Sequence, residues 1–328
     1  MASGQKIRSA VPDAKRRYAD RLMAYRNVCG VGVGYRVVRG ERTSDVCIRV
    51  YVKRKLPEDQ LARADILPKL LDGVLVDVIE SEFQTHFGGP NLTPSERQRK
   101  HPIVLVGGLS VGGLGVTAGT LGASVFERGG GRQLLLSNWH ILCGHADCES
   151  GEAIVQPGVA DGGTKSDVVA RVFRAALTDH VDAAVAEITG GRYLIDWISG
   201  IGTVDTVGQA TLGMRVKKSG RTTGFTIGTI SDISADVTVG GYPGGSQTFR
   251  DQIIADSIDS SPVSLGGDSG SLVVNDDDNR AVGLLFAGPR VGGDYFIANP
   301  IDEVLAALRI VIRRDFTILD SDTVQIFA

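Results

Sequence analysis

Glycine is the feature that most constrains the fold of this chain, because 43 of its 328 residues are glycine. From residue 103 to about residue 300, short apolar runs alternate with turns rich in glycine and aspartate. Such spacing favours many short strands joined by tight turns, which is typical of a β-barrel or a β-sandwich. We therefore predict a mainly β fold for this part of the chain.

Length and composition exclude several classes of protein. A chain of 328 residues suggests roughly two domains and can bury a substantial core. Hydrophobic residues make up 42% of the chain, charged residues 22%, and the net charge is −3, which argues against nucleic acid as the main partner. The sequence lacks a run of about 18 apolar residues and an apolar run of signal-peptide length at its N-terminus. We therefore expect a cytoplasmic protein with no membrane partner.

The first part of the chain predicts a small α+β domain over residues 1–84. A short amphipathic helical pattern is followed by alternating strand patterns at 28–38 and 45–53 and by a third strand at 74–80. A short helix is also expected at 57–64.

The rest of the chain divides into a linker, a large domain and a tail. Residues 85–102 contain three prolines, two glycines and a polar run, which predicts a linker. Residues 103–315 form the predicted β domain, closed by an amphipathic helix over 301–314 with acidic residues in its first turn and arginines in its last. Residues 316–328 form a C-terminal tail.

Three segments carry residues suited to nucleophilic catalysis, each where an apolar run meets a turn. The segment LLLSNWHIL presents His140, DHVDAAVAEI presents Asp182, and LGGDSGSLVV presents Ser269. A serine hydroxyl is a weak nucleophile until an imidazole accepts its proton, and a carboxylate orients that imidazole. We therefore predict His140 as general base, Asp182 as its partner and Ser269 as nucleophile.

The glycines around Ser269 predict an oxyanion hole. Negative charge develops on the carbonyl oxygen during acyl transfer, and loss of one donor to it typically costs about 10²–10³ in rate. Flanking glycines let the backbone curl so that the amides of Gly267 and Ser269 can donate into one small site.

The motifs resemble those of a known family. SNWH, VDAAVA and GGDSGS are similar to the three active-site blocks of chymotrypsin-fold (trypsin-like, PA clan) serine peptidases. KSGRTTGFTIGTI and the N-terminal blocks VCGVGVGYR and DVCIRVYVKRK resemble the bacterial intracellular type and the plant Narrow Leaf protein family. The resemblance spans approximately residues 28–312. It implies a chymotrypsin-like double β-barrel, the roles assigned above to His140, Asp182, Ser269 and Gly267, and a position for Asp268 beneath the oxyanion hole.

Two departures from this family pattern concern the support of the site. Phe286 stands where trypsin-like enzymes usually have a serine near the triad aspartate. Secreted trypsins also pair the aspartate before the nucleophile with a newly formed N-terminus. Because a whole domain precedes the barrel here, Asp268 must find another partner.

The resemblance also places a specificity pocket, which we expect to favour a small or apolar substrate side chain. An acidic residue a few positions before Ser269 is absent, although Asp294 could reach the pocket and favour a basic side chain. The predicted pocket residues are Val263, Leu265, Phe286, Gly288 and Asp294.

Four cysteines, at positions 29, 47, 143 and 148, are too few for a disulfide scaffold of this size, and we expect reduced thiols. A disulfide between Cys143 and Cys148 and a zinc site formed with His140 and His145 are alternatives. A catalytic His140 could not also ligate a metal, so we expect no metal and no other cofactor. The basic cluster of Arg97, Arg99, Lys100 and His101 is interpreted as a solvated part of the linker.

These patterns predict a serine endopeptidase acting on a protein or peptide substrate. A weakly catalytic or non-catalytic binding protein on a peptidase fold is the alternative, motivated by Phe286, and another acyl hydrolase such as an esterase is a third. A homo-oligomer is left open.

Overall fold

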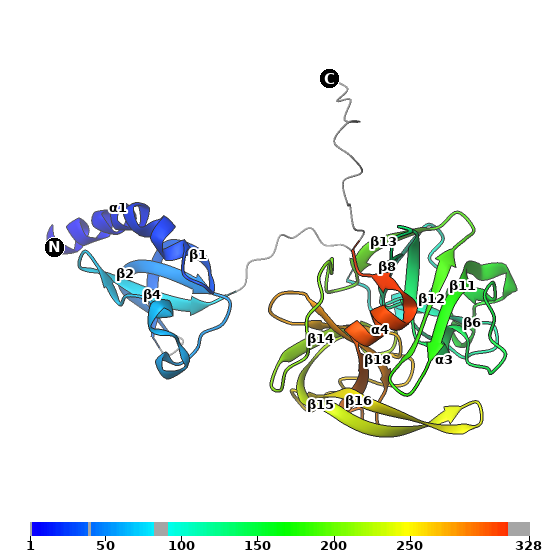
Figure 1. Ribbon diagram of the computed structural model, residues 1–328. Coiled ribbons are helices and arrows are strands. Elements are labelled where there is room, and N and C mark those ends of the chain that lie inside the picture. Colours follow the sequence, from blue (N-terminus) through cyan, green and yellow to red (C-terminus); the bar gives the residue numbers. More distant parts are fainter. Residues whose placement is uncertain (1, 39–40, 82–90, 314–328) are drawn as a thin grey trace. The chain divides into compact units, whose positions relative to one another are not determined.

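The computed structural model describes residues 2–38, 41–81 and 91–313 (Figure 1). The chain separates into two compact units, residues 1–88 and 89–328. The predicted tail 316–328 and residues 85–90 of the predicted linker lie outside the described residues.

The first unit packs one helix against a four-stranded sheet, as an α+β region should. Helix residues Val11, Ala14 and Leu22 are buried together with Ile48 and Val50 of the second strand. The first two strands pair antiparallel, and the second pairs parallel with the fourth. The elements are α1 (Ala2–Met23) and, in sheet order, β1 (Val28–Val38), β2 (Glu41–Val52), β4 (Val74–Glu80) and β3 (Leu70–Leu71).

The prediction of a helix at 57–64 is wrong. Two single 3₁₀ turns, η1 (Glu58–Gln60) and η2 (Arg63–Asp65), occupy this stretch instead. Neither turn buries a residue, so packing does not supply the energy that a longer helix would need.

A closed six-stranded barrel forms one half of the second unit. Its interior is filled by apolar side chains that include Val216, Ile230, Ile253 and Phe296. Around the barrel the strands run in the order β14 (Arg215–Gly220), β15 (Gly224–Tyr242), β16 (Gly245–Ser257), β19 (Tyr295–Pro300), β18 (Ala281–Ala287) and β17 (Leu272–Asn275).

An eight-stranded sheet forms the other half. Its order is β20 (Ile310–Val311), β8 (Ala123–Glu127), β9 (Gln133–Ser137), β12 (Asp182–Ile188), β11 (Val168–Leu177), β10 (Ala153–Val155), β6 (Ser110–Gly113) and β7 (Gly119–Thr120). A parallel pair, β5 (Val104–Gly107) and β13 (Tyr193–Ile198), completes the strands. Four short elements remain: α2 (Pro94–Arg97), α3 (Trp139–Leu142), η3 (Val159–Asp161) and η4 (Lys165–Asp167). The predicted mainly β chymotrypsin-like fold with a small α+β region before it is therefore confirmed.

The last helix is shorter than the 301–314 predicted. Helix α4 (Ile301–Leu308) ends because Arg309 adopts a left-handed conformation with φ 51°. Ile310 then pairs with Glu127 of β8 and is fully buried. The apolar residues that follow Leu308 therefore include a short strand. The helical periodicity of the sequence could not distinguish this strand from a continuation of the helix.

The interpretation of the basic cluster in the predicted linker 85–102 as solvated is wrong for Arg97, whose side chain is fully buried. Its Nε donates to the carbonyl of Leu92 at 2.7 Å and its Nη1 to the hydroxyl of Ser219 at 2.7 Å. Arg99 and Lys100 are exposed, as expected. Sequence alone could not separate them, because a polar run gives no signal for one buried cation.

Among the described residues, no helix is both long and apolar enough to cross a membrane.

A long hairpin of β15 and β16 reaches from the barrel to the eight-stranded sheet (Figure 1). At this contact, the amide of Arg250 donates to the carbonyl of Asp179 at 2.7 Å. Phe249 is fully buried there, with its ring 4.7 Å from that of Phe286 and 5.5 Å from that of Tyr242. The hairpin therefore joins the two halves of the second unit.

Replacing Phe249 by alanine should destabilise the protein by about 3–5 kcal/mol, because a buried ring is lost and a cavity remains. Phe225 is 38% exposed on the same sheet and gives a matched control, since Phe225→Ala should cost far less. Urea unfolding followed by tryptophan fluorescence measures both changes. Equal midpoints for the two variants would contradict the bridging role of Phe249.

Candidate active site

His140 and Asp182 are in direct contact. Nδ1 of His140 lies 2.5 Å from Oδ2 of Asp182, and the backbone amide of His140 donates to Oδ1 at 3.1 Å. The Asp182 carboxylate is fully buried, whereas the imidazole is 26% exposed. Among the described residues, Nε2 of His140 has no hydrogen-bond partner. The carboxylate therefore fixes the tautomer and leaves Nε2 free to accept a proton.

Tyr242 is a functional residue that sequence reasoning missed. Its hydroxyl donates to Oδ2 of Asp182, the same oxygen that faces His140. Burial, followed by the nearby Asp182 charge, raises the pKa of Tyr242, so the phenol stays protonated and remains a donor. The ring of Tyr242 also lies edge-on to His140 with centroids 6.1 Å apart.

Two asparagines fix the backbone at Asp182. The amide of Asp182 donates to Oδ1 of Asn299 at 3.0 Å, and its carbonyl accepts from Nδ2 of Asn138 at 2.8 Å. Both asparagine side chains are fully buried. Together with Tyr242 they determine where the carboxylate lies, so the position of His140 depends on groups from β15 and β19.

The Ser269 hydroxyl is hydrogen-bonded to the backbone and not to the imidazole in the described part of the chain. Its Oγ donates to the carbonyl of Phe286 at 3.1 Å, and among the described residues no hydrogen bond joins it to His140. Phe286 itself is only 3% exposed and packs on Phe249. The Phe286 side chain therefore belongs to the core and does not assist Asp182, which is the role that Tyr242 takes.

The turn before Ser269 keeps two amides available. Gly267 has φ 97°, a backbone conformation that residues other than glycine rarely adopt. Its carbonyl accepts from the hydroxyl of Thr120 at 2.8 Å. Within the described part of the chain, the amides of Gly267 and Ser269 have no acceptor. Free, closely spaced amides are what an oxyanion hole requires.

Asp268 is held by Lys218 and by three backbone amides. Lys218 Nζ lies 3.3 Å from Oδ2, and both side chains are fully buried. Thr222 and Thr223 donate their amides to Oδ1 at 2.9 and 3.1 Å. Leu265 donates its amide to Oδ2 at 3.0 Å. Lys218 is therefore the partner that Asp268 needs in place of a free N-terminus.

Arg97 lies behind this pair. It contacts Ser219, the residue after Lys218, and its Nη2 has no hydrogen-bond partner in the described protein. Burial lowers the pKa of Arg97 to about 10 despite the attraction of Asp268. Arg97 thus adds a second buried positive charge near the Asp268 carboxylate, with which Lys218 forms the ion pair.

The predicted specificity residues come from segments that the structure brings together. The amide of Val263 donates to the carbonyl of Gly293 at 2.8 Å, and Gly288 approaches the carbonyl of Tyr295. Val263 is 1% exposed and faces the barrel core, whereas Leu265 is 43% exposed. Gly288 and Asp294 are also exposed.

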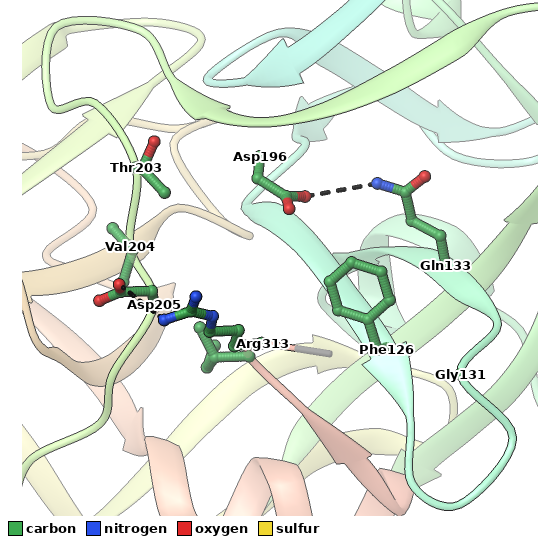
Figure 2. Close-up of a pocket in the computed structure, with 9 residues that line it drawn as sticks. Phe126, Gly131, Gln133, Asp196, Thr203, Val204, Asp205 and Arg313 are labelled. Carbon is green, nitrogen blue, oxygen red and sulfur yellow. Dashed lines mark hydrogen bonds and ion pairs between the residues drawn. The ribbon is translucent and has the colours of Figure 1, made fainter. Parts of the chain in front are cut away.

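A separate pocket of about 610 Å³ contains none of the residues named for catalysis (Figure 2). Two polar pairs cross its wall, with Nε2 of Gln133 donating to Asp196 at 3.3 Å and Arg313 lying 3.5 Å from Asp205. Its lining comprises Phe126, Gly131, Gln133, Asp196, Thr203, Val204, Asp205, Ile312 and Arg313.

The expectation of four reduced thiols is wrong for two cysteines. Cys143 and Cys148 are joined by a disulfide, whereas Cys29 and Cys47 are free. The short turn after α3 holds the two Cα atoms 5.4 Å apart, which is within the usual range for a disulfide.

The lowered pKa of Lys218 predicts a pH dependence of stability. Burial lowers its pKa to about 8 from an unfolded value of about 10.5, so the folded state binds fewer protons between these values. Considering this group alone, the free energy of unfolding is lowest below pH 8, where Lys218 must be buried in its charged form, and it increases with pH from about 8 to 10. Urea midpoints across this range should increase more in the wild type than in Lys218→Met, and parallel pH profiles would contradict the assignment.

Comparison with known proteins gives relatives for both units. Residues 15–79 match the family described as NARROW LEAF 1 N-terminal domain. The chain is 26% identical to Protein NARROW LEAF 1 of Oryza sativa subsp. japonica in an alignment of 304 positions that covers 79% of this chain and 51% of the rice protein. The chain thus spans about half the length of this curated relative.

Several solved protease structures are similar in fold. Nocardiopsis protease is 22% identical with a TM-score of 0.47, and the match covers 64% of this chain and 99% of that one. Thermobifida fusca protease A is 19% identical with a TM-score of 0.48, over 64% and 99% of the two chains. A glutamic acid specific serine protease is 23% identical with a TM-score of 0.47, over 63% and 98%.

The resemblance predicted from the motifs is thus confirmed: this chain is similar to rice Narrow Leaf 1 over most of its length, and its residues 15–79 match the N-terminal domain of that family.

Proposed function

We propose that this protein is a serine endopeptidase in which Ser269 is the nucleophile, His140 the general base and Asp182 the residue that orients it. The observation that carries the proposal is the buried Asp182 carboxylate bound to Nδ1 of a partly exposed His140 whose Nε2 is free. Burying a carboxylate against an imidazole costs desolvation free energy, so such a pair needs a functional reason. General-base catalysis by the imidazole supplies that reason. The substrate is a protein or peptide.

In this mechanism Ser269 Oγ bonds to the carbonyl carbon of the substrate while its proton passes to Nε2 of His140. The resulting oxyanion accepts from the amides of Gly267 and Ser269, which have no acceptor in the described protein. His140 then donates the proton to the leaving amine as the C–N bond breaks. Water hydrolyses the acyl-enzyme by the same route, with His140 again as base.

Attack requires Ser269 to change its hydrogen bond. Its hydroxyl donates to the carbonyl of Phe286 at 3.1 Å, so rotation about χ1 must turn Oγ toward His140. Hydrogen bonds of catalytic groups are often long or misaligned before substrate binds. The same observation favours the second candidate, a binding protein on a peptidase fold in which Ser269 stays bound to Phe286.

Replacing Ser269 by alanine should abolish both hydrolysis of a broad peptide library and labelling by a fluorophosphonate probe, because the only proposed nucleophile is removed. Ser231→Ala is the matched control, since Ser231 is exposed and lies outside the site. Mass spectrometry reads both outcomes. Hydrolysis by Ser269→Ala at the wild-type rate would refute the triad, and a wild type that neither labels nor cleaves would favour the binding protein. Cleavage of esters without amides would favour an esterase.

Tyr242→Phe should lower kcat by about 10- to 100-fold, because a hydrogen bond to a charged group contributes about 1.5–3 kcal/mol. The ring remains, so the packing against His140 and Phe249 is preserved and KM should change little. Tyr193→Phe is the control, because Tyr193 is 68% exposed. Steady-state kinetics with the best library peptide measure the split, and an unchanged kcat would reduce Tyr242 to a packing residue.

A further inference from the structure

The turn that follows α3 gathers metal-ligating side chains that the proposed catalysis does not use. Ligand atoms of His145, Cys148 and Glu152 all lie within 4.8 Å of one another. Nε2 of His145 is 2.8 Å from Oε2 of Glu152. These donors, an imidazole nitrogen, a sulfur and a carboxylate oxygen, are those that bind zinc.

The backbone around this group is fixed before any metal binds. The amide of Gly151 donates to the carbonyl of Val172 at 2.7 Å, and the amide of Val172 donates to the carbonyl of Glu152 at 2.9 Å. The amide of Glu149 donates to Oε1 of Glu152 at 2.9 Å. One carboxylate oxygen is therefore held by the protein while the other faces His145, as an outer-shell partner holds a metal ligand.

Cys143 supplies a fourth ligand when the disulfide is open. Its sulfur is bonded to that of Cys148 and so lies beside the group of three. Reduction leaves two thiols next to the imidazole and the carboxylate, and these four groups match the number and types of ligands of a tetrahedral zinc site. His145 is 47% exposed and Glu152 34% exposed, so an ion can enter from solvent.

The structure also removes the objection that sequence raised against a metal here. The sequence-based alternative counted His140 as a ligand, but Nδ1 of His140 is bound to Asp182. Glu152, which the sequence reasoning did not consider, takes that place.

We propose that the reduced protein binds one Zn²⁺ through Cys143, His145, Cys148 and Glu152, and that the disulfide and the zinc site are alternative states of the same turn. A dithiol reductant attacks the disulfide, its two electrons break the S–S bond, and the reductant leaves as its own disulfide. Each cysteine sulfur then loses a proton as it binds zinc, which stays divalent throughout. Thiolates favour zinc over magnesium and calcium.

The exchange between disulfide and zinc can affect His140 because both cysteine ligation and His140 involve the same short helix, α3. Cys143 is the C-cap residue of α3, and its amide donates to the carbonyl of Trp139 at 2.8 Å. His140 lies in the same single turn of helix. Either closure, by disulfide or by zinc, therefore ties down the end of the helix that carries His140. The metal site itself does not rest on the proposed peptidase activity.

The test measures zinc in the full chain after native reduction with dithiothreitol and removal of the reductant. We expect one zinc per reduced chain by mass spectrometry and none in the oxidised chain. Cobalt substitution should give the thiolate charge-transfer and d–d bands of a tetrahedral site. Cys148→Ser should abolish binding, and Glu152→Gln should weaken zinc binding at least about tenfold in a competition with a chelating dye.

Two control variants test whether zinc binding depends on the proposed ligands rather than on any cysteine or histidine. Cys47→Ser removes a free buried thiol elsewhere and His180→Ala removes an exposed imidazole, and both should bind zinc as the wild type does. The proposal is overturned if the reduced wild type takes up no zinc, if Cys148→Ser retains it, or if the oxidised chain binds equally. It also fails if thiol titration shows that the disulfide resists reduction in the folded protein.

Discussion

The candidate active site depends on one buried carboxylate, that of Asp268. It accepts from Lys218 and from the amides of Thr222, Thr223 and Leu265, so the strand end at β14 and the turn before the serine are fixed to one another. A buried carboxylate must be paired and hydrogen-bonded to offset the cost of removing it from water, and these donors meet that requirement. Because Asp268 lies between Gly267 and Ser269, its position sets the course of the backbone on both sides.

This arrangement needs glycine at a point where two segments of the chain approach each other closely. A Cβ on Gly220 would lie 2.2 Å from Oδ1 of Asp268, so any other residue would push the carboxylate out of the turn. The buried positive side chains of Lys218 and Arg97 near this carboxylate would suit the oxyanion of the proposed mechanism. Arg97 comes from the segment that enters the second unit, so the beginning of that unit is part of the support of the serine turn.

Sequence reasoning succeeded where chemistry and pattern coincide in a short segment. It named His140 and Asp182, which the structure brings into contact, and predicted the β architecture from glycine-rich turns. It missed Tyr242, which lies 60 residues from Asp182 at the end of a hairpin strand. The only local signal was an aromatic residue among glycines, and its partner became visible only when the hairpin crossed to the other half of the unit.

Arg97 was misjudged, and the Tyr242 donor was missed when Phe286 was considered, for the same physical reason. Burial is a property of the whole fold, and a polar run or a core strand looks the same in sequence whatever it faces. Phe286 suggested a weakened triad because a serine was absent from one strand. In the structure a hydroxyl from β15, that of Tyr242, donates to Asp182 in place of the absent serine.

Because this donor lies on the β15–β16 hairpin, the site depends on the position of that hairpin. Tyr242 stands at the end of a hairpin whose far residues are largely exposed, unlike a donor on a barrel strand next to Ser269. Its hydrogen bond persists because Trp139, His140 and Phe249 surround the ring. The orientation of His140 is therefore coupled to the position of the β15–β16 hairpin on the eight-stranded sheet, and anything that lifts the hairpin also removes the Tyr242 hydrogen bond from Asp182.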